Sequence, residues 1–278
     1  MKIVQPSVTI IQETNPLKRI ELAARVCYKS EGKITEDSAL PLIKRLIARG
    51  HMTPLEHARV ALDTRNVLPR SLEASLRPEP YGFRDRVGHP EGDMDTVYAS
   101  VRDLLAVGYG LEDVVKLPNA PDYMTAHLIC DRGIANELIT HRVLSKAQES
   151  TRYCKYATDV SYVYPVPFPP FKGKPSPEEV KREVVWRSAC TMAERHYAQL
   201  ISFGASPQEA RNVLPLSLKT ELIVTTTYDN WAGILALRLH KDAHPQMVYL
   251  MELLVNNKLF PKDKIEVPNA KQRPHACH

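Results

Sequence analysis

Hydrophobic positions along the chain follow two different periods. Runs rich in β-branched residues predict strands, and residues 222–228 (LIVTTTY) are the clearest case. Apolar residues spaced three and four apart predict helices, as in residues 17–28. Further strands are expected at 4–12, 59–64 and 123–130, an extended segment at 160–170, a short helix from 207, and helices at 39–48, 136–143, 176–203, 231–239 and 245–256.

The predicted strands lie far apart in the sequence, with helices between them. This order predicts an α/β (α+β) fold in which helices flank a mixed sheet. Local signals support two of the helix starts. Pro177 falls in the first turn of the long helix, and Thr35 is expected to cap the helix that Gly50 stops.

Residues 66–121 have a different texture, with six prolines and five glycines. Such residues end regular elements, so this segment is predicted to be a partly ordered insertion between core elements. One helix is expected within it, at 95–105. The whole chain, 1–278, is expected to form a single domain around this insertion.

Composition narrows the class of protein. A chain of 278 residues with 44% hydrophobic and 25% charged residues is ordinary for one large globular domain or two modest ones. No apolar run approaches the roughly 18 residues of a membrane span. The first residues are typical of a strand and not of an export signal. A net charge of +5 suits an anionic ligand as well as a nucleic acid.

The cysteines are odd in number and have no CxxC spacing, which predicts reduced thiols in a cytoplasmic protein. His275, Cys277 and His278 could chelate a metal, but they lie at the extreme terminus without a tetrahedral framework, so no metal site is predicted. The five cysteines are Cys27, Cys130, Cys154, Cys190 and Cys277.

Residues 140–153 (THRVLSKAQESTRY) gather polar groups that suit an anionic ligand. A helix bearing His141 and Arg142 is expected to run into an irregular polar segment. Guanidinium forks bind phosphate, amides and hydroxyls read the edge of a planar base, and an imidazole can contact a cofactor ring. From composition alone, a solvated helix end is favoured over an anion site for this segment.

Four segments of the chain, taken in order, resemble the motifs of the flavin-dependent thymidylate synthases. The family has an Arg-His-Arg triplet, seven residues, a Ser and then Arg-Tyr, which residues 141–153 match after the first Arg. The likeness covers residues 1–65 and 122–260, and the four segments together are specific where each alone is weak. The other three are 49–57 (RGHMTPLEH), which resembles Gly-His-x-(Thr/Ser)-x-x-Glu-His, 210–218 (ARNVLPLSL), which resembles Ala-Arg-x-x-Leu-Pro, and 237–246, which resembles the Leu-Arg and (His/Glu)-Ala-Gln region.

The resemblance implies an enzyme that moves a one-carbon unit from 5,10-methylenetetrahydrofolate to C5 of dUMP, forming dTMP. It implies FAD as cofactor and NADPH as its reductant. It also implies a homotetramer with sites at subunit junctions, and neither a membrane nor a nucleic-acid polymer as partner. The family uses no cysteine nucleophile.

The resemblance also assigns roles by position. Ser150 and Arg152 would hold the nucleotide, with Arg211 as a second phosphate ligand. Arg238 would lie at the pyrimidine edge and favour the N3-deprotonated base, because a guanidinium stabilises a nearby anion. Arg238 and Ser150 are therefore the catalytic candidates. Glu137, Gln148 and Glu149 complete the substrate set, and the flavin-side candidates are His51, Thr53, His141, Arg142, Gln148, Thr227 and Asp229.

Simpler roles compete at single positions. Thr53 before Pro54 could shape a turn, Glu56 and His57 could form a polar pair at a helix end, and Arg211 could be a surface charge.

Three positions depart from the family pattern. Thr140 replaces the first Arg of the triplet, Lys146 and Ala147 alter the following loop, and residues 227–229 (TYD) stand where many members have Asn-x-Arg. Asp in place of Arg opposes an anionic dinucleotide by about 1 to 3 kcal/mol when partly buried. Two alternatives stay open: the same fold acting on another pyrimidine nucleotide as a C5 methylase or hydroxymethylase, and a nucleotide-binding protein without flavin chemistry.

Overall fold

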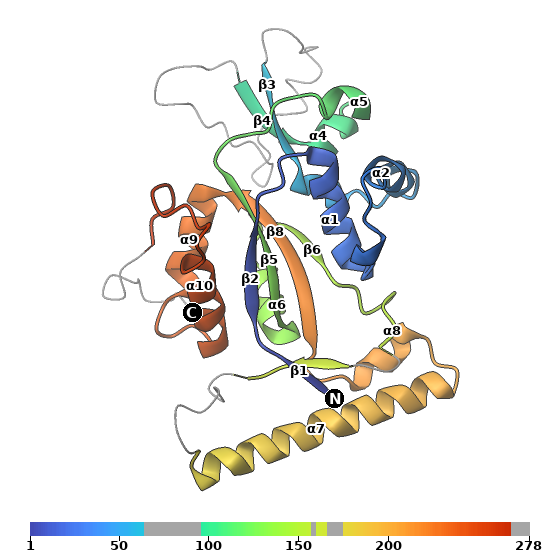
Figure 1. Ribbon diagram of the computed structural model, residues 1–278, viewed down its shortest axis with the longest axis vertical. Helices are drawn as coiled ribbons and strands as arrows, with labels where there is room; N and C mark the ends of the chain where they lie inside the picture. Colours follow the sequence, from blue (N-terminus) through green and yellow to red (C-terminus); the bar gives the residue numbers. More distant parts are fainter. Residues whose placement is uncertain (64–95, 157–159, 166–174, 268–278) are drawn as a thin grey trace.

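A four-stranded antiparallel sheet forms the centre of the computed structural model, which describes residues 1–63, 96–156, 160–165 and 175–267 (Figure 1). The order of the strands is β2-β5-β8-β6, so β6 is an edge strand. The register pairs His127 of β5 with Ile223 of β8, and Ser145 of β6 with Thr225 of β8. The bounds are β2 Ser7–Ile11, β5 Tyr123–Asp131, β8 Lys219–Thr227 and β6 Ser145–Gln148.

Two smaller sheets flank the central one. β1 (Lys2–Val4) pairs in parallel with β7 (Ser161–Val163), and β3 (Arg59–Asp63) pairs antiparallel with β4 (Thr96–Ser100). The strand predicted at 4–12 is β2, which starts later than predicted, at Ser7, because Val4 already ends β1. Pro6 lies between them, where its missing N–H and fixed φ interrupt a ladder.

Different helices cover the two faces of the central sheet. α6 (Arg132–Leu138), α9 (Tyr228–Arg238) and α10 (Pro245–Val255) pack on one face, where Leu222 and Val224 of β8 join the largest buried cluster. Side chains alternate along a strand, so Ile223 points to the other face, where Ala23 and Val26 of α1 (Pro16–Tyr28) cover it. Figure 1 shows α9 and α10 on one side of the sheet and α1 on the other.

α1 ends at a lysine in the left-handed backbone conformation. Its C-cap residue is Lys29, which has φ 49° in the left-handed region, and the Lys29 N–H donates to the Arg25 and Val26 carbonyls. This conformation is common at a helix C-terminus but costs a residue with a Cβ more than it costs glycine.

A second buried cluster joins α1 to the elements around β3 and β4. It contains Ile20, Leu55, Ala99, Val101 and Leu104, all at most 2% exposed. The elements are α2 (Ala39–Ala48), η2 (Thr53–His57), α4 (Val101–Ala106) and α5 (Leu111–Val114).

The helix predicted at 95–105 is wrong in its first half. Residues 96–100 (TVYAS) form β4, because their β-branched and aromatic side chains suit pairing with β3, and the helix begins only after Ser100 caps it. The described part of the predicted insertion, 96–121, thus contributes to a core; residues 66–95 lie outside the described part. Ser38, not Thr35, is the N-cap residue of α2.

The long helix α7 (Pro177–Ser202) confirms the prediction at 176–203. Ser176 and Glu179 form a capping box, and Pro177 is in the first turn. α7 lies beside β1 and α8 (Pro207–Ala210), as Figure 1 shows, and buries Cys190 and Tyr197 in a third cluster. No helix in the described ranges is long and apolar enough to cross a membrane.

Candidate active site

The segment from 131 to 148 differs from its prediction. The helix expected at 136–143 is α6, which starts after the N-cap residue Asp131 and ends at Leu138. His141 and Arg142 lie in the following turn, and residues 145–148 form β6 instead of an irregular segment. Four residues in extended form satisfy the backbone groups of β8, which would otherwise be unpaired at its edge.

Arg238, at the end of α9, contacts the turn after α6. Its Nε donates to His141 Nε2 at 2.8 Å, and its terminal nitrogens donate to the Glu137 carboxylate at 3.4 Å, to the Glu137 carbonyl at 3.1 Å and to Thr140 Oγ at 3.5 Å. Four of its five N–H groups are therefore used within the described chain, and one remains for a ligand. Thr140, which replaces the family's Arg, thus takes part in holding Arg238.

His141 is neutral at physiological pH. Burial, with the neighbouring Arg238 and Lys146 cations, lowers its pKa from 6.5 to about 4. Because Nε2 accepts from Arg238, the proton of the neutral ring is on Nδ1, which can donate to another group.

The group of Ser150, Arg152 and Tyr153 lies beside α1, on the face of the sheet opposite to Arg238. The Ser150 N–H donates to the Cys27 carbonyl at 3.0 Å, and the Tyr153 ring lies 5.6 Å from that of Tyr28. Arg152 is exposed and lies 5.6 Å from the Tyr153 ring centre. The residues assigned to the nucleotide by position thus form two groups on opposite faces in one chain.

A cavity of about 320 Å³ adjoins the segment that contains Ser150. Arg132, Thr151, Arg211 and Asn212 line it, with apolar residues of 214–218 and no carboxylate among the described lining residues. Arg211 donates to Thr151 Oγ at 3.0 Å. The Arg132 Nη1 is buried and has no hydrogen-bond partner in the described part of the chain. Two guanidiniums, a hydroxyl and an amide without an acid suit a phosphate group.

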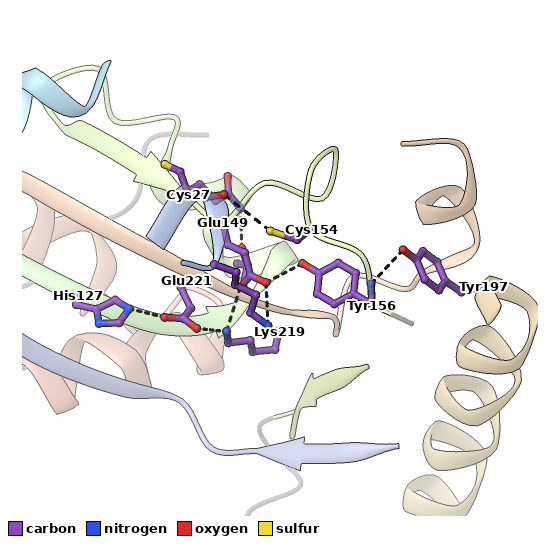
Figure 2. Close-up of polar contacts among 11 residues, drawn as sticks. Cys27, His127, Glu149, Cys154, Tyr156, Tyr197, Lys219 and Glu221 are labelled. Carbon is purple, nitrogen blue, oxygen red and sulfur yellow. Dashed lines mark hydrogen bonds and ion pairs between the residues drawn. The ribbon is translucent and has the colours of Figure 1, made fainter. Parts of the chain in front are cut away.

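Glu149 belongs to a buried ionic network (Figure 2). Its side chain is fully buried and contacts Tyr156 Oη at 2.7 Å and Lys219 Nζ at 3.0 Å. Lys219 also pairs with Glu221, whose other oxygen lies 2.7 Å from His127 Nε2. Burial by itself would raise the pKa of Glu221, but hydrogen bonds and charges from His127 and Lys219 together lower it to about 2.

Gln148, by contrast, is only partly buried, and its amide donates weakly to Thr220 Oγ at 3.3 Å. It therefore remains available to a ligand in a way that Glu149 does not.

The flavin-side candidates are spread over η2, the turn after α6, β6 and the junction of β8 with α9. His51 and Thr53 are exposed at the start of η2, and the His51 Nδ1 lies 2.7 Å from Tyr28 Oη. Arg142 and Asp229 are exposed, whereas Thr227 is buried as the N-cap residue of α9 and accepts from the Asn230 N–H at 3.2 Å. The imidazole, hydroxyl and guanidinium donors fit the phosphate and ring oxygens of a dinucleotide; Asp229 opposes them.

Glu56 and His57 do not form a pair with each other. Glu56 pairs with Arg102, and His57 is fully buried with Nδ1 2.9 Å from Thr225 Oγ. Burial and the Arg59 and Arg19 cations lower the His57 pKa to about 3, so this imidazole is neutral and structural.

Comparison with known proteins gives the family. The sequence profile described as thymidylate synthase complementing protein matches residues 9–77 and 121–262. The chain belongs to this family. The resemblance predicted from four motifs is thus confirmed, and the chain is an enzyme of the flavin-dependent thymidylate synthase type. The profile leaves 78–120 unmatched, a range within the predicted insertion.

Individual relatives in the thymidylate synthase complementing family are distant. The flavin-dependent thymidylate synthase of Geobacter sulfurreducens is 23% identical over 225 residues, which is 78% of this chain and 67% of that protein. The enzyme of Thermococcus onnurineus is 27% identical over 110 residues, 39% of this chain and 42% of its own.

Among solved structures, the UMP/dUMP methylase PolB from Streptomyces cacaoi is similar at low identity. With 5-Br dUMP bound it is 19% identical with a TM-score of 0.44, covering 91% of this chain and 89% of its own. With 5-Br UMP bound the identity is 17% and the TM-score 0.45, covering 91% and 88%.

Sequence reasoning missed Arg132 and Lys219. Arg132 directly follows strand β5, Lys219 is the first residue of strand β8, and the family motifs assign a role to neither residue. The one sequence signal that they share is a basic residue at the boundary of a buried strand.

Proposed function

We propose that this protein transfers a one-carbon unit from 5,10-methylenetetrahydrofolate to C5 of a uracil nucleotide, dUMP first, with reduced FAD as cofactor and NADPH as reductant. The observation that carries the proposal is the convergence of the motif segments. Arg238 of the fourth segment contacts His141 of the second at 2.8 Å, and Arg211 of the third contacts Thr151 of the second at 3.0 Å. These pairs are 97 and 60 residues apart in the sequence.

The cavity lined by Arg132 and Arg211 is the proposed phosphate subsite. Its two cations are uncompensated by acids among the described lining residues, so a phosphate would relieve their mutual repulsion. Ser150 and Arg152 flank Thr151 in the chain and are proposed as further phosphate donors at the entrance, since the cavity itself is lined by Thr151.

Arg238 is the proposed base-edge residue. Its remaining N–H can donate to the pyrimidine, and its charge favours the N3-deprotonated form, which enriches electron density at C5. His141 and Glu137 keep the guanidinium plane fixed, so little reorganisation is needed when charge develops.

We propose that the complete site lies between copies of the chain in a homotetramer. Arg238 is on the α6 and α9 face, whereas Ser150 and Arg152 lie beside α1 on the other face. One nucleotide that contacts both groups is therefore best accommodated between two copies of the chain.

The flavin would be held by His51, Thr53, His141, Arg142 and Gln148. When bound, reduced flavin supplies the hydride that converts the transferred methylene into a methyl group. Asp229 lies in the first turn of α9, and its negative charge weakens the attraction for the FAD phosphates. We therefore expect moderate FAD affinity.

The test has two measurements on the purified protein. The first is the visible spectrum during titration with FAD, and the second is formation of dTMP from dUMP, methylenetetrahydrofolate and NADPH, with UMP as the competing substrate. Flavin binding with dTMP formation supports the proposal. Nucleotide binding without any flavin band supports the alternative of a nucleotide-binding protein, and product from UMP alone supports the ribonucleotide alternative.

A further inference from the structure

Glu149 differs in exposure from Ser150 and Arg152. It comes directly after β6 and is 2% exposed, whereas Ser150 is partly exposed and Arg152 is exposed; Thr151 between them is buried. Both oxygens of this buried carboxylate are used in contacts within the chain. Its contacts show what it holds.

Three separate parts of the chain supply partners to the Glu149 carboxylate. Tyr156 Oη donates to Oε1 at 2.7 Å, and Lys29 Nζ from the end of α1 lies 3.3 Å from the same oxygen. Lys219 Nζ at the start of β8 donates to Oε2 at 3.0 Å. Figure 2 shows the Glu149 carboxylate between Tyr156 and Lys219.

The bond from Glu149 to Tyr156 closes the segment between them. Within that segment the Cys154 N–H donates to the Ser150 carbonyl at 3.0 Å. The Tyr156 N–H donates in turn to Tyr197 Oη of α7 at 3.3 Å. Residues 150–155 therefore form a turn whose two ends are anchored to the sheet and to α7.

We propose that Glu149 is a positioning residue, whose buried carboxylate fixes the turn at 150–153 in the shape that binds the nucleotide phosphate. This inference rests on the proposed function for Ser150 and Arg152. It also reassigns Glu149, expected from its position to contact substrate, to a contact with its own chain. A turn held in its bound shape loses less conformational entropy on binding, which improves affinity.

The protonation states of Tyr156 and Lys219 keep their contacts with the Glu149 carboxylate in place. Burial and the nearby Glu149 raise the pKa of Tyr156, so its hydroxyl keeps the proton that it donates. Burial by itself would lower the pKa of Lys219, but the Glu149 and Glu221 carboxylates raise it, so the ammonium stays charged.

The test compares two substitutions in the same network, Glu149→Gln and Glu221→Gln. Both remove one carboxylate charge beside Lys219 and keep the shape of the side chain. The Glu221 backbone bonds to that of Glu149, but its carboxylate contacts Lys219 and His127 instead of Tyr156 and Lys29, so removing this charge weakens the network without releasing residues 150–153. Amide hydrogen exchange of 150–153 without ligand, melting temperature and the dUMP dissociation constant are measured for each.

Glu149→Gln is expected to speed exchange at 150–153 and to raise the dUMP dissociation constant about tenfold, and Glu221→Gln is expected to lower the melting temperature only. Tyr156→Phe removes one hydroxyl, leaves the ion pairs, and should change exchange in the same direction if Glu149→Gln does not fold. Unchanged exchange in Glu149→Gln or Tyr156→Phe, or an equal rise in Glu221→Gln, would overturn the positioning role.

Arg152→Ala separates the two proposals. If wild-type protein does not bind dUMP, or Arg152→Ala binds it equally well, the proposed function fails, and the exchange rates still decide whether Glu149 orders the turn. If Arg152→Ala loses affinity while Glu149→Gln keeps the wild-type value, only the positioning role fails.

Discussion

Arg238 combines a structural and a proposed chemical role in one side chain. Its fork contacts His141, Glu137 and Thr140, so a lysine at 238 would keep the charge but lose the planar set of donors. Arg238→Lys is expected to weaken dUMP binding modestly and to slow single-turnover carbon transfer by about 100-fold, since the interaction strengthens as charge develops. An unchanged single-turnover rate at a normal melting temperature would remove Arg238 from the mechanism.

Arg132 gives a test of the phosphate subsite. Arg132→Gln removes the charge and should raise the dUMP dissociation constant by at least about tenfold, the typical effect of losing a charge-assisted hydrogen bond. Deoxyuridine lacks the phosphate, so its weaker binding should not change. Arg195→Gln on the exposed side of α7 is the matched control. Equal losses for nucleotide and nucleoside would place Arg132 outside the subsite.

Several elements followed directly from the sequence. The β-branched run at 222–228 is most of β8, and Ser176, Pro177 and Glu179 mark the start of α7 at the predicted residue. Local side chains decide these cases. The β6 strand could not be predicted in this way, because residues 145–148 become a strand only through pairing with β8, which comes some 75 residues later.

The packing of η2 against the sheet has a pH consequence. His57 is fully buried and its pKa is lowered to about 3, so the unfolded chain binds a proton below pH 6.5 that the folded chain does not. Its contribution to stability is present above pH 6.5 and is lost as pH falls towards 3.

By this linkage, wild-type protein should lose about 2 kcal/mol of unfolding free energy from His57 between pH 7 and pH 5. His57→Gln keeps a hydrogen-bonding group for Thr225 but cannot take the proton. Its urea-unfolding free energy should therefore fall less over this interval, although it is lower at pH 7. Parallel pH profiles for the two proteins would show that His57 does not titrate in this way.

Subunit assembly gives a test of the whole site. If Arg238 and Arg152 act on one nucleotide from different copies, Arg238→Ala and Arg152→Ala tetramers each lack every complete site. Mixed tetramers, formed by unfolding and refolding the two together, regain some sites in which both arginines are wild type. Carbon-transfer activity should then recover to about a quarter of wild type for random assembly. No recovery in verified mixed tetramers would place both residues in one chain's site.

The sequence points to candidate members of the site but not to their geometry. Arg211, Arg238 and Ser150 are candidates because their segments resemble the family, and their roles stay predictions. The contact of Arg238 with Thr140, the orientation of Glu149 and the cavity beside Arg132 depend on which residues the sheet brings together across 60 to 100 positions. A local pattern carries no information on such distances.

The left-handed backbone at Lys29 links the end of α1 to the ordering of the turn at 150–153. Glycine would fit this conformation better, yet lysine there directs its ammonium to Glu149 at 3.3 Å and over the Tyr156 ring at 5.4 Å. A change to glycine would thus have two opposite effects. It would relieve backbone strain at the end of α1, and it would remove a cation from the contacts of Glu149. Lys29→Gly would therefore trade a backbone that suits its φ of 49° for the loss of one cation beside Glu149, so helix-end stability and order in the turn need not change together.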